Sequence, residues 1–184
     1  MRVLAKISMY ASQKPYPEIS FSVVYLASKY NKATKDDYGK AMRIAECIVG
    51  CGDGHSLILA QKSLQLIARS DASYAEHKDG RSHIGGCIGF ESDTTCWFTW
   101  VSCKRPVVDY LSTCESELIA TSTIGCGVEW GRQFLQELGH VQLNIEIGVD
   151  YKCSMHLLEQ GTGSFKLAKH IKVRYFWLKD LIDE

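Results

Sequence analysis

The sequence predicts an α/β (α+β) fold in which a mixed sheet with flanking helices follows a small helical segment. Three observations predict it. Residues 1–63 space their apolar side chains as helices do, the pattern changes to alternation of period two from about residue 56, and a long helix then leads into one more strand. With 184 residues, the chain is long enough for one good core, or for one domain and a smaller appendage.

The composition excludes several classes of protein. There are 21 basic and 21 acidic side chains, so the overall charge does not by itself indicate nucleic-acid binding. No stretch approaches the roughly 18 apolar residues of a membrane span, and no signal peptide opens the chain, so we expect no membrane association. The eight cysteines form no CxxC pair and predict reduced core thiols, rather than disulfides or a zinc site, in an intracellular compartment: cytoplasm, nucleus or an organelle.

Residues 1–63 predict helices. Pro15 and Pro17 mark a helix entrance, because proline is tolerated in the first turn and not in the interior. Thr34 is the predicted N-cap of a second helix that ends at Gly50. The apolar positions of the first helix are Ile19, Val23, Leu26 and Tyr30, and those of the second are Tyr38, Ala41, Met42, Ala45, Ile48 and Val49.

Period-two alternation then predicts strands. A short strand is expected at 55–60, and a second begins at Leu64 and ends at Asp71, where a polar stretch begins. Two further strands, at 83–90 and 96–103, are separated by a five-residue turn typical of an antiparallel hairpin.

The remaining elements are a crossover helix, a strand and two helices. The crossover helix opens near Ser112, ends at Gly139 and is expected to bury Leu118, Ile119, Ile124, Trp130, Phe134 and Leu138. Alternating apolar residues from Leu143 to Val149 then predict a strand that ends in Asp150. A short helix is expected at 152–159 and a last one from about Phe165, burying Leu167, Ile171, Tyr175 and Leu178.

This order predicts a carboxylate site. A right-handed crossover places the last strand parallel to the strand of Asp71, so Asp71 and Asp150 meet at one sheet edge. The crossover helix aims Glu117 at the same edge. Three carboxylates this close repel one another unless a cation joins them, and Mg²⁺ prefers such oxygen ligands.

Several segments carry a resemblance to a known family. They are Ser70-Asp-Ala-Ser-Tyr74, Gly80-Arg-Ser-His-Ile-Gly-Gly86, Trp100-Val-Ser-Cys-Lys104, Thr113-Cys-Glu-Ser-Glu-Leu-Ile-Ala120, Val149-Asp150 and Lys169-His-Ile-Lys-Val-Arg-Tyr175. In this order and spacing, residues 64–184 resemble the ribonuclease H domain of copia-type retrotransposon polyproteins. Residues 1–63 resemble the end of the reverse transcriptase that precedes it. The Tyr-x-Asp-Asp hairpin of a polymerase site is absent from the sequence.

The resemblance implies a fold, an activity and a metal site. The fold is a ribonuclease H-like mixed sheet whose last elements, with a fourth metal-site aspartate, are missing here. Asp71, Glu117 and Asp150 would bind two Mg²⁺ ions, with Mn²⁺ as a substitute, and these would promote endonucleolytic cleavage of RNA in RNA–DNA hybrids. Tyr151 and Lys172 replace the asparagine and the acid that are usual in the family.

Basic residues supply candidate contacts with nucleic acid. Lys104 and Arg105 follow a strand and could reach phosphates of the DNA strand, while His170, Lys172 and Arg174 lie on the last helix. The three residues of the last helix have a plainer interpretation as surface or capping residues of that helix.

Two functions are compatible with these patterns. The first is a retrotransposon-derived ribonuclease H. The second is a catalytically inactive, domesticated form of the same fold that binds nucleic acid or serves as a structural subunit of a larger ribonucleoprotein assembly, with a protein partner covering an exposed sheet edge. The three acids favour the first, and the missing final elements favour the second.

Overall fold

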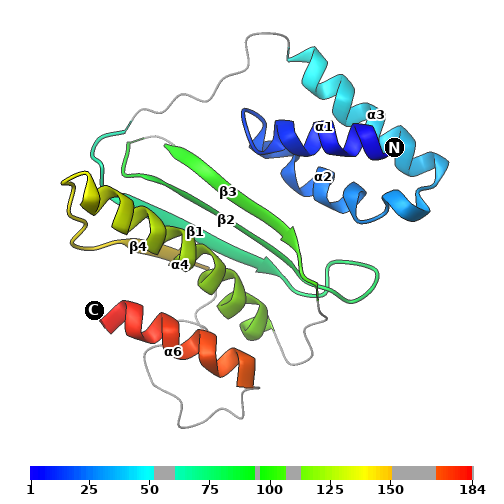
Figure 1. Cartoon of the computed structure of the whole chain (residues 1–184). Coiled ribbons are helices and arrows are strands. Elements are labelled where there is room, and N and C mark those ends of the chain that lie inside the picture. The colour runs from blue at the N-terminus through cyan, green and yellow to red at the C-terminus, as the bar shows by residue number, and fades with distance from the viewer. Residues whose placement is uncertain (52–60, 94–95, 107–112, 151–168, 184) are drawn as a thin grey trace. The chain divides into compact units, whose positions relative to one another are not determined.

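A computed structural model of the chain describes residues 1–51, 61–93, 96–106, 113–150 and 169–183. Internal contacts divide the chain into two compact units, residues 1–59 with 102–104, and residues 60–101 with 105–184. The first unit is helical and the second contains the sheet (Figure 1). The strand predicted at 55–60 and the helix predicted at 152–159 lie outside the described residues.

Residues 1–51 of the helical unit form three α-helices and two 3₁₀ turns. These are α1 (Arg2–Ser12), η1 (Pro17–Ile19), α2 (Ser20–Ala27), η2 (Tyr30–Lys32) and α3 (Lys35–Gly50). Pro17 opens η1, as expected for an entrance. The prediction that Tyr30 continues the buried stripe is wrong, because α2 ends at Ala27 and Tyr30 is exposed in η2. The core residues are Tyr16, Ile19, Val23, Leu26, Ala41 and Ile44.

Helix α3 begins with the predicted cap. The hydroxyl of Thr34 accepts a hydrogen bond from the backbone N–H of Asp37, and the Asp37 carboxylate accepts one from the backbone of Thr34. The backbone N–H of Thr34, and next its hydroxyl, which donates to Asp37 Oδ2 at 2.7 Å, lower the pKa of Asp37 to about 2. The predicted apolar side is partly wrong: Tyr38, Met42 and Val49 are exposed, because the stripe that packs on α1 and α2 passes through Asp37, Ala41 and Ile44.

The sheet has the predicted mixed topology. Its strands are β1 (Leu66–Ser73), β2 (His83–Phe90), β3 (Trp97–Lys104) and β4 (Glu146–Val149), in the order β3-β2-β1-β4. Strand β1 pairs antiparallel with β2 and parallel with β4. The architecture is therefore α+β, with one parallel strand pair in a sheet flanked by helices, and is consistent with a ribonuclease H-like fold.

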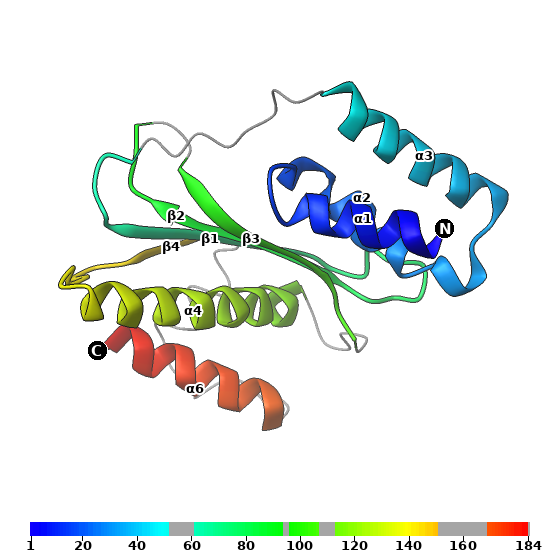
Figure 2. The ribbon, with the colours of Figure 1, turned by 45° about the horizontal axis from the view of Figure 1, so that its top comes forward.

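Helices α4 (Thr113–Glu137) and α6 (Lys169–Asp183) form two further layers. Figure 2 shows α4 between the sheet and α6, and α4 contacts β1, β2 and β4 on one side and α6 on another. Glycines permit this close approach: a Cβ on Gly86 would lie 2.5 Å from the Ile124 side chain, and one on Gly125 would lie 3.2 Å from Trp177. The core between α4 and the sheet is formed by Leu66, Ala68, Ile88, Ile124, Val128 and Leu135.

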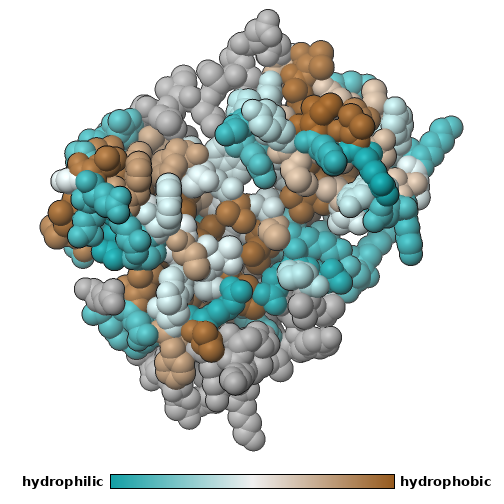
Figure 3. Space-filling model, viewed as in Figure 1, coloured by the Kyte–Doolittle hydropathy of each residue, from teal (hydrophilic) through white to brown (hydrophobic). Residues whose placement is uncertain are grey.

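The C-terminal half of α4 corrects one prediction. Trp130, Phe134 and Leu138 are exposed, and hydrophobic side chains reach the surface there (Figure 3). Because α4 carries apolar residues around most of its circumference, spacing alone does not identify the stripe that meets the sheet. The predicted stop is confirmed. Gly139 has a φ of +86°, its N–H binds the Gln136 carbonyl, and the next N–H binds that of Leu135, as in a Schellman motif.

No helix in the part of the chain that the structure describes is long and apolar enough to cross a membrane.

Candidate metal and nucleic-acid site

Asp71 lies inside strand β1. The strand continues two residues beyond it to Ser73, so the sequence-based prediction that β1 ends at Asp71 is wrong. Continued pairing with β2 explains the extra length, since Asp71 lies opposite Gly85 and Ser73 opposite His83. Along β1, Leu66, Ala68 and Ser70 are buried, whereas Asp71 is exposed to solvent.

Asp150 lies beside Asp71 by register. The parallel pairing of β1 with β4 ends with Ser70 opposite Val149, so Asp71 and Asp150 are the next residues along the two neighbouring strands. Backbones of paired strands lie about 4.8 Å apart. Asp150 is exposed, like Asp71. The crossover topology therefore brings both aspartates to one end of the β1–β4 pair, as the sequence predicts.

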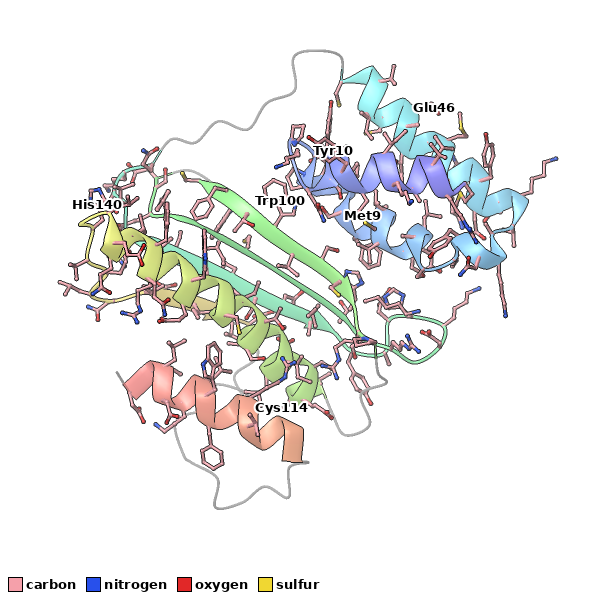
Figure 4. The ribbon with its side chains drawn as sticks, viewed as in Figure 1. Met9, Tyr10, Glu46, Trp100, Cys114 and His140 are labelled. Atoms are coloured by element: carbon pink, nitrogen blue, oxygen red, sulfur yellow. The ribbon has the colours of Figure 1, made fainter. Side chains whose placement is uncertain are left out.

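Glu117 reaches this edge from α4. It lies one turn beyond Cys114, which Figure 4 labels near the start of the helix, on the stripe that continues through Thr121 and Ile124 toward the sheet. Only 6% of Glu117 is exposed. The backbone of Ala72 donates a hydrogen bond to its carboxylate, which fixes Glu117 over the residue after Asp71. Among the described residues, no donor binds its Oε2 atom, which is fully buried.

The environment of Glu117 raises its pKa from an ordinary 4.5 to about 7. Burial is the largest cause, and the negative charge of Asp71 adds to it, while the hydrogen bond from Ala72 acts in the opposite direction. Asp150 makes a further, smaller contribution of the same sign as that of Asp71. The electrostatic influence of both aspartates on Glu117 links the three acids, and a positive charge between them would relieve the repulsion.

The three acids are suited to bind a hard cation, although they do not surround a common point. In the part of the chain that the structure describes, no three His, Cys, Asp or Glu side chains are close enough together to hold a metal ion. The donor set is nevertheless the one that Mg²⁺ prefers, carboxylate oxygens with room for water on the exposed side. The buried Oε2 of Glu117 has no donor in the described part of the chain, and a cation would satisfy this oxygen.

Unlike the two aspartates, the five basic residues predicted to contact nucleic acid do not gather at one described site. Lys104, the last residue of β3, is half-buried, whereas Arg105 is only 9% exposed and does not present a free guanidinium to solvent. Arg174 is exposed on α6, and its Nη1 donates a hydrogen bond to the Ser122 hydroxyl at 2.8 Å. The backbones of His170 and Lys172 belong to α6, but their side chains lie outside the described structure.

Sequence reasoning missed the buried polar groups next to the acids. Ser82 and Ser116 are fully buried, with their hydroxyl oxygens 3.0 Å apart. His77 Nε2 lies 3.1 Å from His83 Nδ1, both rings are buried, and burial, followed by the charge of His77, lowers the pKa of His83 to about 4. The only signal in the sequence was their place in short polar motifs, which does not distinguish buried hydroxyls and imidazoles from loop residues.

Comparison with known proteins points to a retroelement. The chain is 27% identical over 177 residues to the Retrovirus-related Pol polyprotein from transposon TNT 1-94 of Nicotiana tabacum. The match covers 96% of this chain but only 13% of that polyprotein. No family model and no solved structure matches the chain. The chain is thus related to a segment of a retrotransposon Pol polyprotein.

Proposed function

We propose that this chain is a retrotransposon-derived ribonuclease H that cuts RNA in RNA–DNA hybrids with the help of Mg²⁺. The observation that carries the proposal is that the register sets Asp71 beside Asp150 at one end of the β1–β4 pair, where the Ala72 backbone binds Glu117, whose Oε2 is buried and has no donor among the described residues. The relationship to a Pol polyprotein supports it, since such a polyprotein belongs to a retroelement.

In this proposal the three acids bind the metal ions. Asp71, Glu117 and Asp150 hold the cations, and two bound divalent ions would supply an activated water and stabilise the leaving 3′ oxygen. Burial and the charge of Asp71 raise the pKa of Glu117 to about 7, so its neutral form is favoured without metal, and a bound cation would favour the carboxylate.

The basic residues bind the substrate backbone in this proposal. Arg174 and Lys104, whose side chains reach solvent, contact phosphates together with His170 and Lys172 of α6. Arg105 is buried directly after β3, so its contribution is to hold the end of that strand in place for Lys104. Its backbone N–H donates to the Ser82 carbonyl at 3.0 Å, which fixes this end of the strand.

A cleavage assay tests the proposal. The purified chain, mixed with Mg²⁺ and an RNA–DNA hybrid labelled in the RNA strand, should release fragments with 5′-phosphate and 3′-hydroxyl ends. Asp71→Asn and Asp150→Asn should each lower the rate by at least about 100-fold, because each removes a charged ligand. Glu146→Gln is the matched control, since Glu146 is an exposed acid on β4 that pairs with Arg69 at 2.8 Å. Cleavage that survives Asp71→Asn would contradict the proposal.

A function without catalysis is the second candidate. It is favoured by the finding that, among the described residues, no three acidic side chains close around a common point. In that case the chain would bind the hybrid without cutting it, and an edge strand such as β3 would be available to a protein partner. Gel-shift binding that Asp71→Asn leaves unchanged, together with no cleavage, would support this candidate over the first.

A further inference from the structure

Ser82 connects several segments around the first turn of α4. Its hydroxyl accepts a hydrogen bond from the backbone N–H of Ala75 at 3.2 Å and lies 3.0 Å from the hydroxyl of Ser116. Both serines are fully buried, so these hydroxyls have little access to water as an alternative partner. Ser116 precedes Glu117 in α4, and Ala75 follows the end of β1. The contact therefore links the helix turn that carries Glu117 to the chain just beyond Asp71.

A second hydroxyl contact links α4 to β1 on the other side of Glu117. Thr121 donates its hydroxyl proton to the backbone carbonyl of Glu117 at 2.9 Å, and its Oγ1 lies 3.1 Å from the hydroxyl of Ser70. A threonine hydroxyl has one proton, so Ser70 must be the donor to Thr121. The chain of bonds thus runs from Ser70, the neighbour of Asp71, through Thr121 to the backbone of Glu117. Ser70 and Thr121 are both buried.

We propose that these four hydroxyl residues, Ser70, Thr121, Ser82 and Ser116, are positioning residues that hold Glu117 over the end of β1, next to Asp71, before any cation binds. The proposal deepens the proposed function, on which its metal-binding part rests. Buried hydroxyls that are bonded to one another resist displacement, because a shift of the helix would leave them without partners. A ligand held in this way need not be ordered when the cation binds, and loss of such support typically weakens metal binding 10- to 100-fold.

Two threonines of α4 provide a matched test. Thr121→Val removes the hydroxyl that joins α4 to β1 and keeps the shape of the side chain. Thr123→Val is the control, since the Thr123 hydroxyl makes the same kind of bond, to the Ile119 carbonyl four residues earlier at 2.8 Å, and contacts no hydroxyl of the sheet among the described residues. Thr121→Ser restores the hydroxyl and serves as the rescue variant. Ser116→Ala tests the second contact independently.

The first measurement needs no metal. Hydrogen exchange of the Ala72 amide reports on Glu117, because that N–H binds the Glu117 carboxylate. We expect Thr121→Val and Ser116→Ala to accelerate exchange at Ala72 at least about fivefold relative to other amides of β1, and Thr123→Val and Thr121→Ser to leave it unchanged. If Thr121→Val and Thr123→Val behave alike at Ala72, the four hydroxyls do not position Glu117 and the inference is overturned.

The second measurement is Mg²⁺ binding by titration calorimetry. We expect Thr121→Val to weaken binding about 10-fold or more and Thr123→Val to change it less than about twofold. If the wild-type chain binds no Mg²⁺, the proposed function fails, while the exchange result at Ala72 still decides whether the hydroxyls position Glu117. If Mg²⁺ binds equally well to Thr121→Val and the wild type, the positioning role is overturned and the proposed function stands.

Discussion

At the scale of single residues, Glu117 is the most informative group in the molecule. The fold buries this acid, and its carboxylate accepts one hydrogen bond from the backbone. Its other oxygen has no donor among the described residues. Burying a carboxylate in this way costs stability, since the charged form loses water and gains little in return. Such a cost is commonly found where a charged group serves a ligand, which is the role that we propose for Glu117.

The raised pKa of Glu117 predicts how stability depends on pH without metal. Since the folded chain binds this proton more tightly than the unfolded chain, the free energy of unfolding should fall as pH rises from about 4.5 to about 7, and stay lower above that. Glu117→Gln stays neutral and should be more stable than the wild type at pH 8, by up to about 3 kcal/mol, but similar to it at pH 4. Urea denaturation at both pH values, with EDTA present, measures the difference.

His83 has the opposite pH dependence and serves as the internal control. Its pKa is lowered to about 4, so its contribution to stability is lost as pH falls from about 6.5 toward 4. This loss occurs in the wild type and in Glu117→Gln alike, and it cancels in the difference between them. A difference that is the same at pH 4 and pH 8 would show that Glu117 has an ordinary pKa.

At the scale of elements, α4 positions most of the candidate site. One stripe of the helix carries Glu117 and Thr121 to β1, and a second side meets α6 through Gly125 and Ser122. A Cβ at Gly125 would press on Trp177 and Leu178, so the small residue lets α6 pack closely on α4. The basic residues of α6 therefore depend on α4 for their position.

Arg174 of α6 has two possible roles: contact with phosphate, and packing of α6 on α4 through its bond to Ser122. If Arg174 contacts phosphate, Arg174→Ala should weaken binding of the chain to an RNA–DNA hybrid and reduce the slope of log K against log salt by about one. Ser122→Ala removes the 2.8 Å bond but keeps the charge, and it should lower stability by about 0.5–1.5 kcal/mol without changing that slope. Equal slopes for the wild type and Arg174→Ala would assign Arg174 to helix packing alone.

At the scale of the whole molecule, the described residues form two hydrophobic cores with no residue in common. One lies among α1, α2 and α3, and the other lies between α4 and the sheet. The molecule has no net charge and a pI near 7.0. Affinity for nucleic acid must therefore come from where its basic residues lie rather than from their excess.

The separation of the two cores predicts which helices and strands a core substitution destabilises. Leu26 and Leu66 are 4% and 1% exposed, one in each core, and Leu→Ala at such sites typically costs about 2–5 kcal/mol. We expect Leu26→Ala to accelerate amide exchange mainly in α1, α2 and α3, and Leu66→Ala to do so mainly in β1, β2 and α4. Exchange that accelerates equally in all elements for both variants would show that the chain unfolds as one cooperative unit.

Much of the candidate site follows from local patterns. Alternating apolar residues mark β1 and β4, the long helix between them requires a parallel crossover, and a right-handed crossover places Asp71 beside Asp150. The capping box at Thr34 and the stop at Gly139 are equally local, since a few neighbouring residues form them. These features could be predicted because each depends on backbone geometry within a short segment or on a general rule of chain handedness.

The sequence by itself thus determined the α+β class, the parallel pairing of β4 with β1 and the neighbouring positions of two aspartates, whereas tertiary structure decided what surrounds them. Only packing shows that Glu117 and Arg105 are buried, that Trp130 is exposed, and that Ser70 and Thr121 bond across two elements. The reason is physical: a periodic pattern reveals that a helix has an apolar stripe, but the loss of water from a given polar group depends on residues far away in the chain. The chemistry of Glu117 arises from that loss of water.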